Sequence, residues 1–289
     1  MDILIIGLLL GGTYALMAMG LQLQYGVARI MNLANGEMLI AGAFGTFWFY
    51  NASSQSSPLW SLIGIIPLAF AANWVIYMVL ILPLVKRAKN QGQLEVDSIL
   101  ATFGLSFILV GLLLALVGGE YLTYSYLARP IIIFNEPYGL NRIVAFICAA
   151  MLCAGLYLWL QKTRPGLALR AVAVNPSAAS LVSINVSRAS ALAFAIGGAV
   201  SAAGGTILSM FLTFDASLGV IFTLKALVIV VMGGVSDIRG AIVASFILGL
   251  TETAVARLVD PGLTLAAAYV LFMIVLLVRP EGLFGRRSS

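Results

Sequence analysis

The chain has 289 residues, of which 62% are apolar and 9% charged, and its mean hydropathy is +1.07. Soluble domains carry roughly 25% charged residues, so this composition excludes a water-soluble globular protein. The apolar runs lack the strict alternation of outer-membrane barrel strands. The sequence therefore predicts an all-α, polytopic transmembrane helical bundle.

Apolar runs that end at polar residues or at Pro and Gly predict about nine spans, within a range of eight to ten. They cover residues 3–25, 37–50, 59–85, 98–117, 142–161, 189–212, 219–235, 240–257 and 263–279. The first run follows Asp2 and lacks the basic residues of a signal peptide, which indicates a retained span. We expect residues 1–289 to form a single transmembrane domain.

The second predicted span, 37–50, is short, because a membrane crossing needs roughly 20 residues. The stretch before it, 31–37, is polar and contains a glycine. It is either a plain loop or part of a broken helix, and non-helical backbone at membrane depth occurs where it lines a cavity or is covered by protein. A re-entrant segment would reduce the count to eight spans and place the N-terminus inside.

The basic residues predict the orientation. Twelve of the 16 lysines and arginines fall in the linkers after spans 1, 3, 5 and 7 and in the C-terminal tail. Only Arg129, Arg142 and Arg257 fall on the other side. The positive-inside rule then places the N-terminus outside and the C-terminus inside. The basic residues behind the net charge of +5 are dispersed over the cytoplasmic segments, so this charge is a signal of membrane topology and does not indicate a nucleic-acid partner.

Several residue types needed for chemistry are missing. The chain has no histidine, which removes histidine triads and HExxH zinc sites. No lysine follows a glycine as in a P-loop, so no nucleotide site of its own is expected. Cys148 and Cys153 lie five apart in one apolar run and are interpreted as buried thiols. We expect no enzyme activity and no cofactor.

Two charged residues lie inside predicted spans. Lys225 and Glu252 both fall roughly 8–9 Å below the outer membrane edge at 1.5 Å per helical residue. Intramembrane charges mark functional sites by default. Equal depth on consecutive antiparallel spans also suits a structural ion pair, and both interpretations stay open.

Small residues recur every fourth position in two spans. Close helix packing in lipid uses such stripes, and sliding of these helices during gating is the alternative. The stripes are Ala193, Gly197, Ser201 and Gly205 in one span, and Ala241, Ser245, Gly249 and Thr253 in the other.

The longest cytoplasmic insertion is the loop 162–188. Asn175 followed by Pro176 is typical of a helix start, with an N-cap and a proline at the first helical position. This predicts a helix over 176–182 that follows another over 167–174. Such a pair suits docking to a cytoplasmic partner, and a solvated basic connector is the alternative.

Four stretches resemble the permease subunits of high-affinity branched-chain amino acid ABC importers, the LivH type. They are Asn32-Leu33-Ala34-Asn35-Gly36-Glu37, 101–106, the loop motif between Thr163 and Asn185, and Gly233-Gly234…Gly240-Ala241 with Glu252 and the tail 279–285. The likeness runs along the whole chain. It implies a bacterial cytoplasmic (inner) membrane protein.

The resemblance also implies partners and roles. Relatives of this type work with a second permease subunit, two cytoplasmic ATPase subunits that use the ATP, and a periplasmic substrate-binding protein. The ATPase-coupling residues would be Arg164, Gly166, Arg170, Ala171, Asn175, Pro176, Ala178, Leu181 and Asn185. The translocation-path candidates would be Asn32, Asn35, Glu37, Thr102 and Ser106.

Three positions depart from the family pattern. Asn35 stands where the family usually has His, which bears on the pathway lining and hence the substrate. Ser183 replaces a common Gly, and residues 237–239 replace a common S-I-P. The last two departures lie in cytoplasmic segments.

The alternatives to an amino acid ABC permease are a permease for urea, an amide or a related solute, and an ion-coupled secondary transporter. Ion coupling needs titratable groups near mid-membrane, and neither Lys225 nor Glu252 is central. An intramembrane enzyme with a Ser/Lys dyad around Lys225 is the remaining class.

Overall fold

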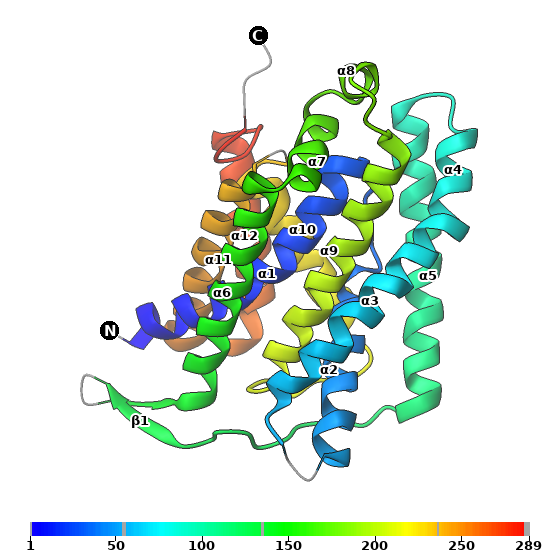
Figure 1. The fold of residues 1–289 in the computed structure, drawn as a ribbon. Coiled ribbons are helices and arrows are strands. Elements are labelled where there is room, and N and C mark those ends of the chain that lie inside the picture. The colour runs from blue at the N-terminus through cyan, green and yellow to red at the C-terminus, as the bar shows by residue number, and fades with distance from the viewer. Residues whose placement is uncertain (1, 54–55, 134–135, 236, 286–289) are drawn as a thin grey trace.

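The computed structural model describes residues 2–53, 56–133, 136–235 and 237–285. In chain order the elements are α1 (Asp2–Ala28), α2 (Asn35–Ala52), the 3-10 turn η1 (Pro58–Ser61), α3 (Leu62–Ile76), the π-helical turn η2 (Tyr77–Ile81), α4 (Leu82–Arg87), α5 (Gln91–Val117), β1 (Pro130–Ile133), β2 (Glu136–Gly139), α6 (Leu140–Lys162), α7 (Arg164–Val174), α8 (Pro176–Leu181), α9 (Val186–Leu208), α10 (Leu218–Gly233), α11 (Ile238–Leu258), the 3-10 turn η3 (Pro261–Leu263) and α12 (Thr264–Val278). Figure 1 shows α7, α8 and the C-terminal segment at one end of the bundle and the antiparallel β1–β2 hairpin at the other.

Among the described residues, seven helical stretches are long and apolar enough to cross a membrane. The 16-residue α10 is a shorter apolar helix, and α2 has 18 residues. Together these segments occupy the nine predicted runs, so the all-α polytopic bundle is confirmed. The third run is continuous over Pro58–Arg87. Its backbone widens into the π turn just before Pro83, which has no N–H to donate to the preceding turn.

The bundle is built around α1 and α9. Of the 18 residues in its most apolar stretch, α1 buries 67% and α9 83%, whereas the 18 residues Pro261–Val278, which comprise η3 and α12, are only 6% buried. A Cβ on Gly20 of α1 would lie 2.3 Å from Ser201 Oγ and 2.6 Å from the Gly197 carbonyl oxygen of α9. A Cβ on Gly249 of α11 would lie 2.6 Å from the Gly7 carbonyl oxygen. The two small-residue stripes are therefore close-packing faces, and sliding during gating stays a prediction.

The helices α2 and α10 begin against each other. A Cβ on Gly36 would lie 1.9 Å from the Gly219 carbonyl oxygen. Every second residue of the non-helical segment 29–34 that leads into α2 is buried: Ile30, Asn32 and Ala34 are at most 1% exposed. Of the two interpretations left open for this stretch, the structure favours a broken backbone covered by protein.

Some boundaries differ from those predicted. The helix α5 begins seven residues before position 98, because the side chain of Asn90 caps it by accepting a hydrogen bond from the Gln93 N–H (2.8 Å). The helix α9 ends at Leu208, four residues before the predicted end. The hairpin of β1 and β2 was not predicted.

Candidate functional site

Polar side chains gather at the break between α1 and α2. Asn32 Nδ2 donates to Gln24 Oε1 of α1 (3.0 Å), and its Oδ1 accepts from the Ala34 N–H (3.0 Å). Thr102 of α5 accepts from the Leu33 N–H (3.0 Å). These bonds satisfy backbone groups that the interrupted helix leaves without helical partners, so they hold the break in one conformation.

The first turn of α2 adds Asn35 and Glu37, both fully buried. Asn35 Oδ1 accepts from the Ser201 hydroxyl of α9 (2.8 Å). Asn35 Nδ2 and both carboxylate oxygens of Glu37 are buried without a hydrogen-bond partner among the described residues. The Glu37 carboxylate faces the first turn of α10, because a Cβ on Gly219 would lie 2.2 Å from its Oε2. Buried polar atoms that lack partners are uncommon and call for an explanation in function or bound solvent.

The structure thus brings four of the five path candidates to one place and adds a residue that sequence reasoning missed. Thr223 of α10 accepts from the Gly36 N–H (2.8 Å) and donates to the Leu33 carbonyl (3.1 Å). No local pattern marks Thr223, since it lies in an apolar run. Ser106 is buried one turn beyond Thr102, and its hydroxyl donates to the Phe103 carbonyl of its own helix (2.8 Å).

Lys225 of α10 and Glu252 of α11 lie together. Lys225 Nζ is 2.9 Å from Glu252 Oε2, with side chains 12% and 4% exposed. Tyr14 of α1 completes the cluster: its hydroxyl donates to Glu252 Oε2 (2.7 Å) and accepts from Lys225 Nζ (2.8 Å). The lysine amine thus bonds to a carboxylate and a phenol, and within the described part of the chain it makes no hydrogen bond to a serine hydroxyl. Tyr14 was missed because its partners come from distant helices.

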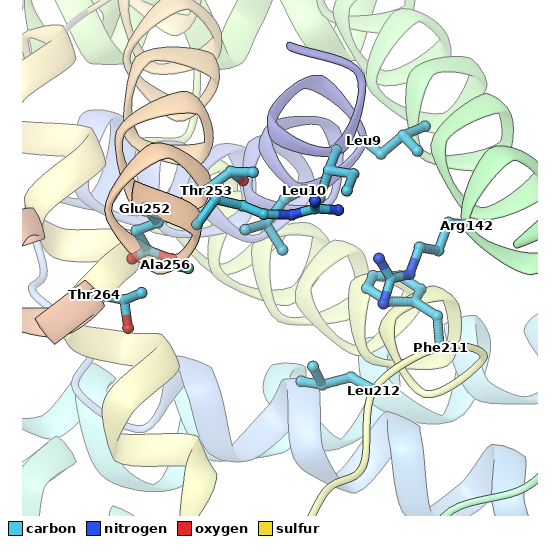
Figure 2. Close-up of a pocket in the computed structure, with 11 residues that line it drawn as sticks. Leu9, Leu10, Arg142, Phe211, Leu212, Glu252, Thr253, Ala256 and Thr264 are labelled. Atoms are coloured by element: carbon cyan, nitrogen blue, oxygen red, sulfur yellow. The ribbon is translucent and has the colours of Figure 1, made fainter. Parts of the chain in front are cut away.

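A cavity of about 350 Å³ lies beside this cluster (Figure 2). Its charged lining residues are Arg142 of α6, Arg257 of α11 and Glu252. The remaining lining residues are Ile6, Leu9, Leu10, Phe211, Leu212, Thr253, Ala256 and Thr264. Figure 2 shows Arg142 reaching from α6 into the cavity next to Phe211.

The loop 162–188 contains α7 and α8, which confirms the predicted pair of helices, although α7 begins three residues before the predicted start and α8 ends one residue before the predicted end. Thr163 caps α7 and Asn175 caps α8, each accepting from the N–H three residues ahead (3.2 and 3.0 Å). Leu169, Val172 and Ala179 are buried against the ends of α1, α6 and α9. A Cβ on Gly166 would lie 2.5 Å from the Trp159 carbonyl oxygen, so only glycine fits there.

The opposite side of α7 and α8 is an exposed platform. It combines large apolar side chains with charge: Val174 is 80% and Leu181 87% exposed. Of the predicted coupling residues, Gly166 is buried, Ala171 and Pro176 are half-buried, and the others are exposed. The exposed ones are Arg164, Arg170, Asn175, Ala178, Leu181 and Asn185. An exposed apolar patch at the end of a transmembrane bundle, outside the membrane, is typical of a protein–protein contact.

The positions that depart from the family pattern have local explanations. Ser183 has φ +62°, the left-handed conformation in which glycine is favoured. Asp237 replaces the common serine as N-cap of α11 and accepts from the Arg239 N–H (2.9 Å). Arg239 Nε donates to the Tyr157 hydroxyl of α6 (2.9 Å).

Among the described residues, no group of three or more His, Cys, Asp or Glu side chains gathers as a metal site requires. Cys148 and Cys153 are free thiols, half-buried and buried respectively.

Comparison with known proteins gives one consistent result. A family model described as "Branched-chain amino acid transport system / permease component" matches residues 3–279. The high-affinity branched-chain amino acid transport system permease protein LivH of Salmonella typhimurium is 29% identical, over 97% of this chain and 94% of the relative. BraD of Pseudomonas aeruginosa is 27% identical over 98% and 95%. A probable LivH of Methanocaldococcus jannaschii is 25% identical over 93% and 88%.

Proposed function

Because this chain belongs to the family of permease components of branched-chain amino acid transport systems, we propose that it carries branched-chain amino acids, or a closely related small polar solute, into the cell. It is a multi-pass permease of the cytoplasmic membrane. The observation that supports ATP-driven transport is the platform formed by α7 and α8. The exposed Val174, Leu181 and Arg170 on it form a surface suited to a cytoplasmic protein.

We propose that this partner is an ATPase subunit, one of two, and that the complex includes a second permease subunit and a periplasmic substrate-binding protein. ATP is then used by the ATPase subunits, and the permease itself has no cofactor and no enzyme activity. The buried anchors Leu169 and Val172 support this role, because they join α7 rigidly to α1, α6 and α9. A movement of the ATPase subunit against the platform would therefore displace α1 and α9, the helices at the centre of the bundle.

The proposed translocation path runs by the break between α1 and α2. Buried backbone outside a helix is stable in a membrane only when it is covered by protein or lines a cavity. Half-helices that start inside the bilayer are also a feature of transporter binding sites. The unpartnered Asn35 Nδ2 and Glu37 carboxylate offer an NH2 group with two N–H donors and two acceptor oxygens to a polar solute.

Reconstitution in proteoliposomes with the cognate ATPases, second permease and binding protein tests the proposal. Leucine and its binding protein should stimulate ATP hydrolysis and uptake. Arg170→Glu should abolish this stimulation, because it reverses an exposed charge on the platform. The matched control, Arg129→Glu, alters an exposed arginine at the opposite end and should leave both activities intact.

Uptake by the permease alone, driven by an ion gradient without ATP, would contradict the proposal and favour an ion-coupled transporter. Stimulation by urea or an amide with no response to branched-chain amino acids would keep the ATPase coupling and replace the substrate. Normal coupling in Arg170→Glu would refute the role of the platform.

A further inference from the structure

The segment that leads from α5 to β1 crosses the end of the bundle opposite α7 and α8, which is the outer end in the predicted orientation (Figure 1). We call residues 121–126 of this segment the strap. Its odd-numbered residues are exposed, and its even-numbered residues, Leu122, Tyr124 and Tyr126, are half-buried. An extended chain turns successive side chains to opposite faces, so one face of the strap packs against the bundle.

Hydrogen bonds attach the strap to the segment between α9 and α10. Leu122 and Phe214 exchange both N–H···O bonds as an antiparallel pair (2.9 and 3.0 Å). The Tyr124 hydroxyl hydrogen-bonds to Ser209 Oγ, one residue after the end of α9 (2.9 Å). Phe214 is fully buried and Ser209 is 1% exposed, so both contacts reach into the bundle.

The strap is also bonded to α2 and to the segment that follows it. The Tyr50 hydroxyl, near the end of α2, donates to the Ser125 carbonyl (3.1 Å), and the ring centroids of Tyr50 and Tyr124 are 4.7 Å apart. A further hydrogen bond joins the Tyr126 hydroxyl to Ser57 Oγ (2.9 Å). The strap therefore ties the outer end of α2 to the α9–α10 segment.

Aromatic rings lie between the strap and the polar residues at the start of α2. Phe44 is two helical turns after Glu37 and therefore on the same face of α2. Its ring centroid is 5.3 Å from that of Phe214, and the ring centroid of Phe47 is 6.3 Å from that of Tyr124. Phe44 and Phe214 are at most 1% exposed. This packing closes the outer route to Glu37 in the present conformation.

Opening this route requires α2 to move away from α9 and α10. These three helices carry the polar groups of the proposed path: Asn35 and Glu37 on α2, Ser201 on α9 and Thr223 on α10. The strap is bonded to both sides of that separation, and hydrogen bonds do not persist when their partners move apart by more than a few tenths of an ångström. The strap must therefore release one side before the path opens outward.

We propose that the strap is the outer gate of the translocation path. In the closed state it holds α2 against the α9–α10 segment, and its release from Phe214 and Ser209 admits the solute from outside. This inference rests on the proposed transport function and adds the place where the path is closed. A purely structural strap would stay in place throughout transport, so a covalent lock distinguishes the two roles.

The first test locks the strap with a disulfide in the reconstituted transport complex. Continuing the antiparallel register of Leu122 and Phe214 by one residue places Thr123 opposite Thr213, and both threonines are exposed. Neighbours of this kind have Cα atoms about 4.5 Å apart, within the range that a disulfide spans. Thr123→Cys and Thr213→Cys are combined in a chain whose two native cysteines are replaced by alanine.

Oxidation of this pair should abolish the leucine uptake that the binding protein stimulates, and reduction should restore it. Each single-cysteine variant is the matched control and should transport equally before and after oxidation. Uptake that continues at the reduced rate with the disulfide formed would overturn the gate and leave the transport function standing. Failure of the pair to cross-link in the resting complex would contradict the closed strap itself.

The second test does not depend on the identity of the solute. Ser209→Cys places a thiol at the buried contact with Tyr124, and its labelling by a membrane-impermeant maleimide is compared between the resting complex and the complex during ATP turnover. Minor conformations are typically populated at up to about 10%, so labelling should become about tenfold faster when the open state dominates. Tyr121→Cys is the control, because Tyr121 is 73% exposed on the outer face of the strap and should label equally fast in both conditions.

Equal labelling rates at position 209 in the two conditions would overturn the gate. Faster labelling at this position without any leucine uptake would support the gate and reject only the proposed substrate.

Discussion

Replacing Gly205 of α9 by alanine tests the tightest backbone approach at any of the described glycines. A Cβ on Gly205 would lie 1.7 Å from the Leu39 carbonyl oxygen and 2.7 Å from its carbon. Real Cβ atoms keep at least 3.0 Å from such atoms, so the gap must open by about 1.3 Å at this point. Both atoms belong to the backbone of α2, and no side-chain rotation relieves the clash.

The loss of stability follows from the hydrogen bonds that this separation of α2 and α9 would break. The flanking bonds between Ser201 and Asn35 (2.8 Å) and between Thr206 and Thr46 (3.0 Å) cross the same interface. A further 1.3 Å takes both beyond hydrogen-bond range. Overpacking costs about 1–3 kcal/mol and each lost bond about 0.5–1.5 kcal/mol, while alanine regains about 1 kcal/mol of helix propensity. We expect a net loss of about 3 kcal/mol.

The assay is the melting temperature of the purified permease in detergent, which should fall by roughly 5–10 °C. The matched control is Gly111→Ala in α5, where a Cβ meets nothing within 4 Å. The control should melt at or slightly above the wild-type temperature. Equal melting of Gly205→Ala and wild type would refute the tight α2–α9 contact.

Three further outcomes are expected. Lys225→Met and Glu252→Gln should each lower the melting temperature and the double variant should regain part of the loss, because removing one partner leaves a buried charge uncompensated; strictly additive losses would exclude the pairing. Ser183→Gly should stabilise the fold by about 0.5–1 kcal/mol by relieving the left-handed backbone, and a lower melting temperature would contradict that explanation. Burial raises the pKa of Tyr124, in the loop between α5 and β1, to about 12 from 10.0. The folded state then holds this proton more tightly, so its contribution is complete below pH 10 and is lost between about pH 10 and 12; Tyr124→Phe should flatten that part of a melting-temperature curve, and an unchanged slope would argue against it.

The sequence alone predicted the features that depend on local composition. Apolar runs mark membrane helices because lipid admits few other residues, and the starts of α7 and α8 follow from caps and prolines within a few positions. The Asn90 cap of α5 is equally local, but the charges at Glu95 and Asp97 concealed it, because they resemble the edge of a span.

The rest depends on contacts between residues far apart in the chain. Tyr14 joins Glu252 across 238 positions, and Thr223 reaches the Leu33 carbonyl across 190. Nothing near Tyr14 or Thr223 distinguishes either from a neighbouring apolar position. The β1–β2 hairpin was missed for another reason: the segment between α5 and α6 has no repeated apolar spacing from which strands are inferred.

The central position of α1 has a consequence for biosynthesis. Gln24 Nε2 donates to the Phe194 carbonyl of α9 (3.0 Å), and Gln22 bonds to carbonyls beyond α10. The ribosome completes α1 at Ala28 and starts α9 at Val186, which at 5–20 residues per second leaves about 8–32 s between them. During that interval Gln24 Nε2 lacks its carbonyl partner on α9, and Gln22 Nε2 waits longer still, for the carbonyls of Gly234 and Val235. We therefore expect α1 to need protection in the membrane at least until α9 is made, and truncation of the nascent chain before α9 should leave α1 the segment most open to degradation.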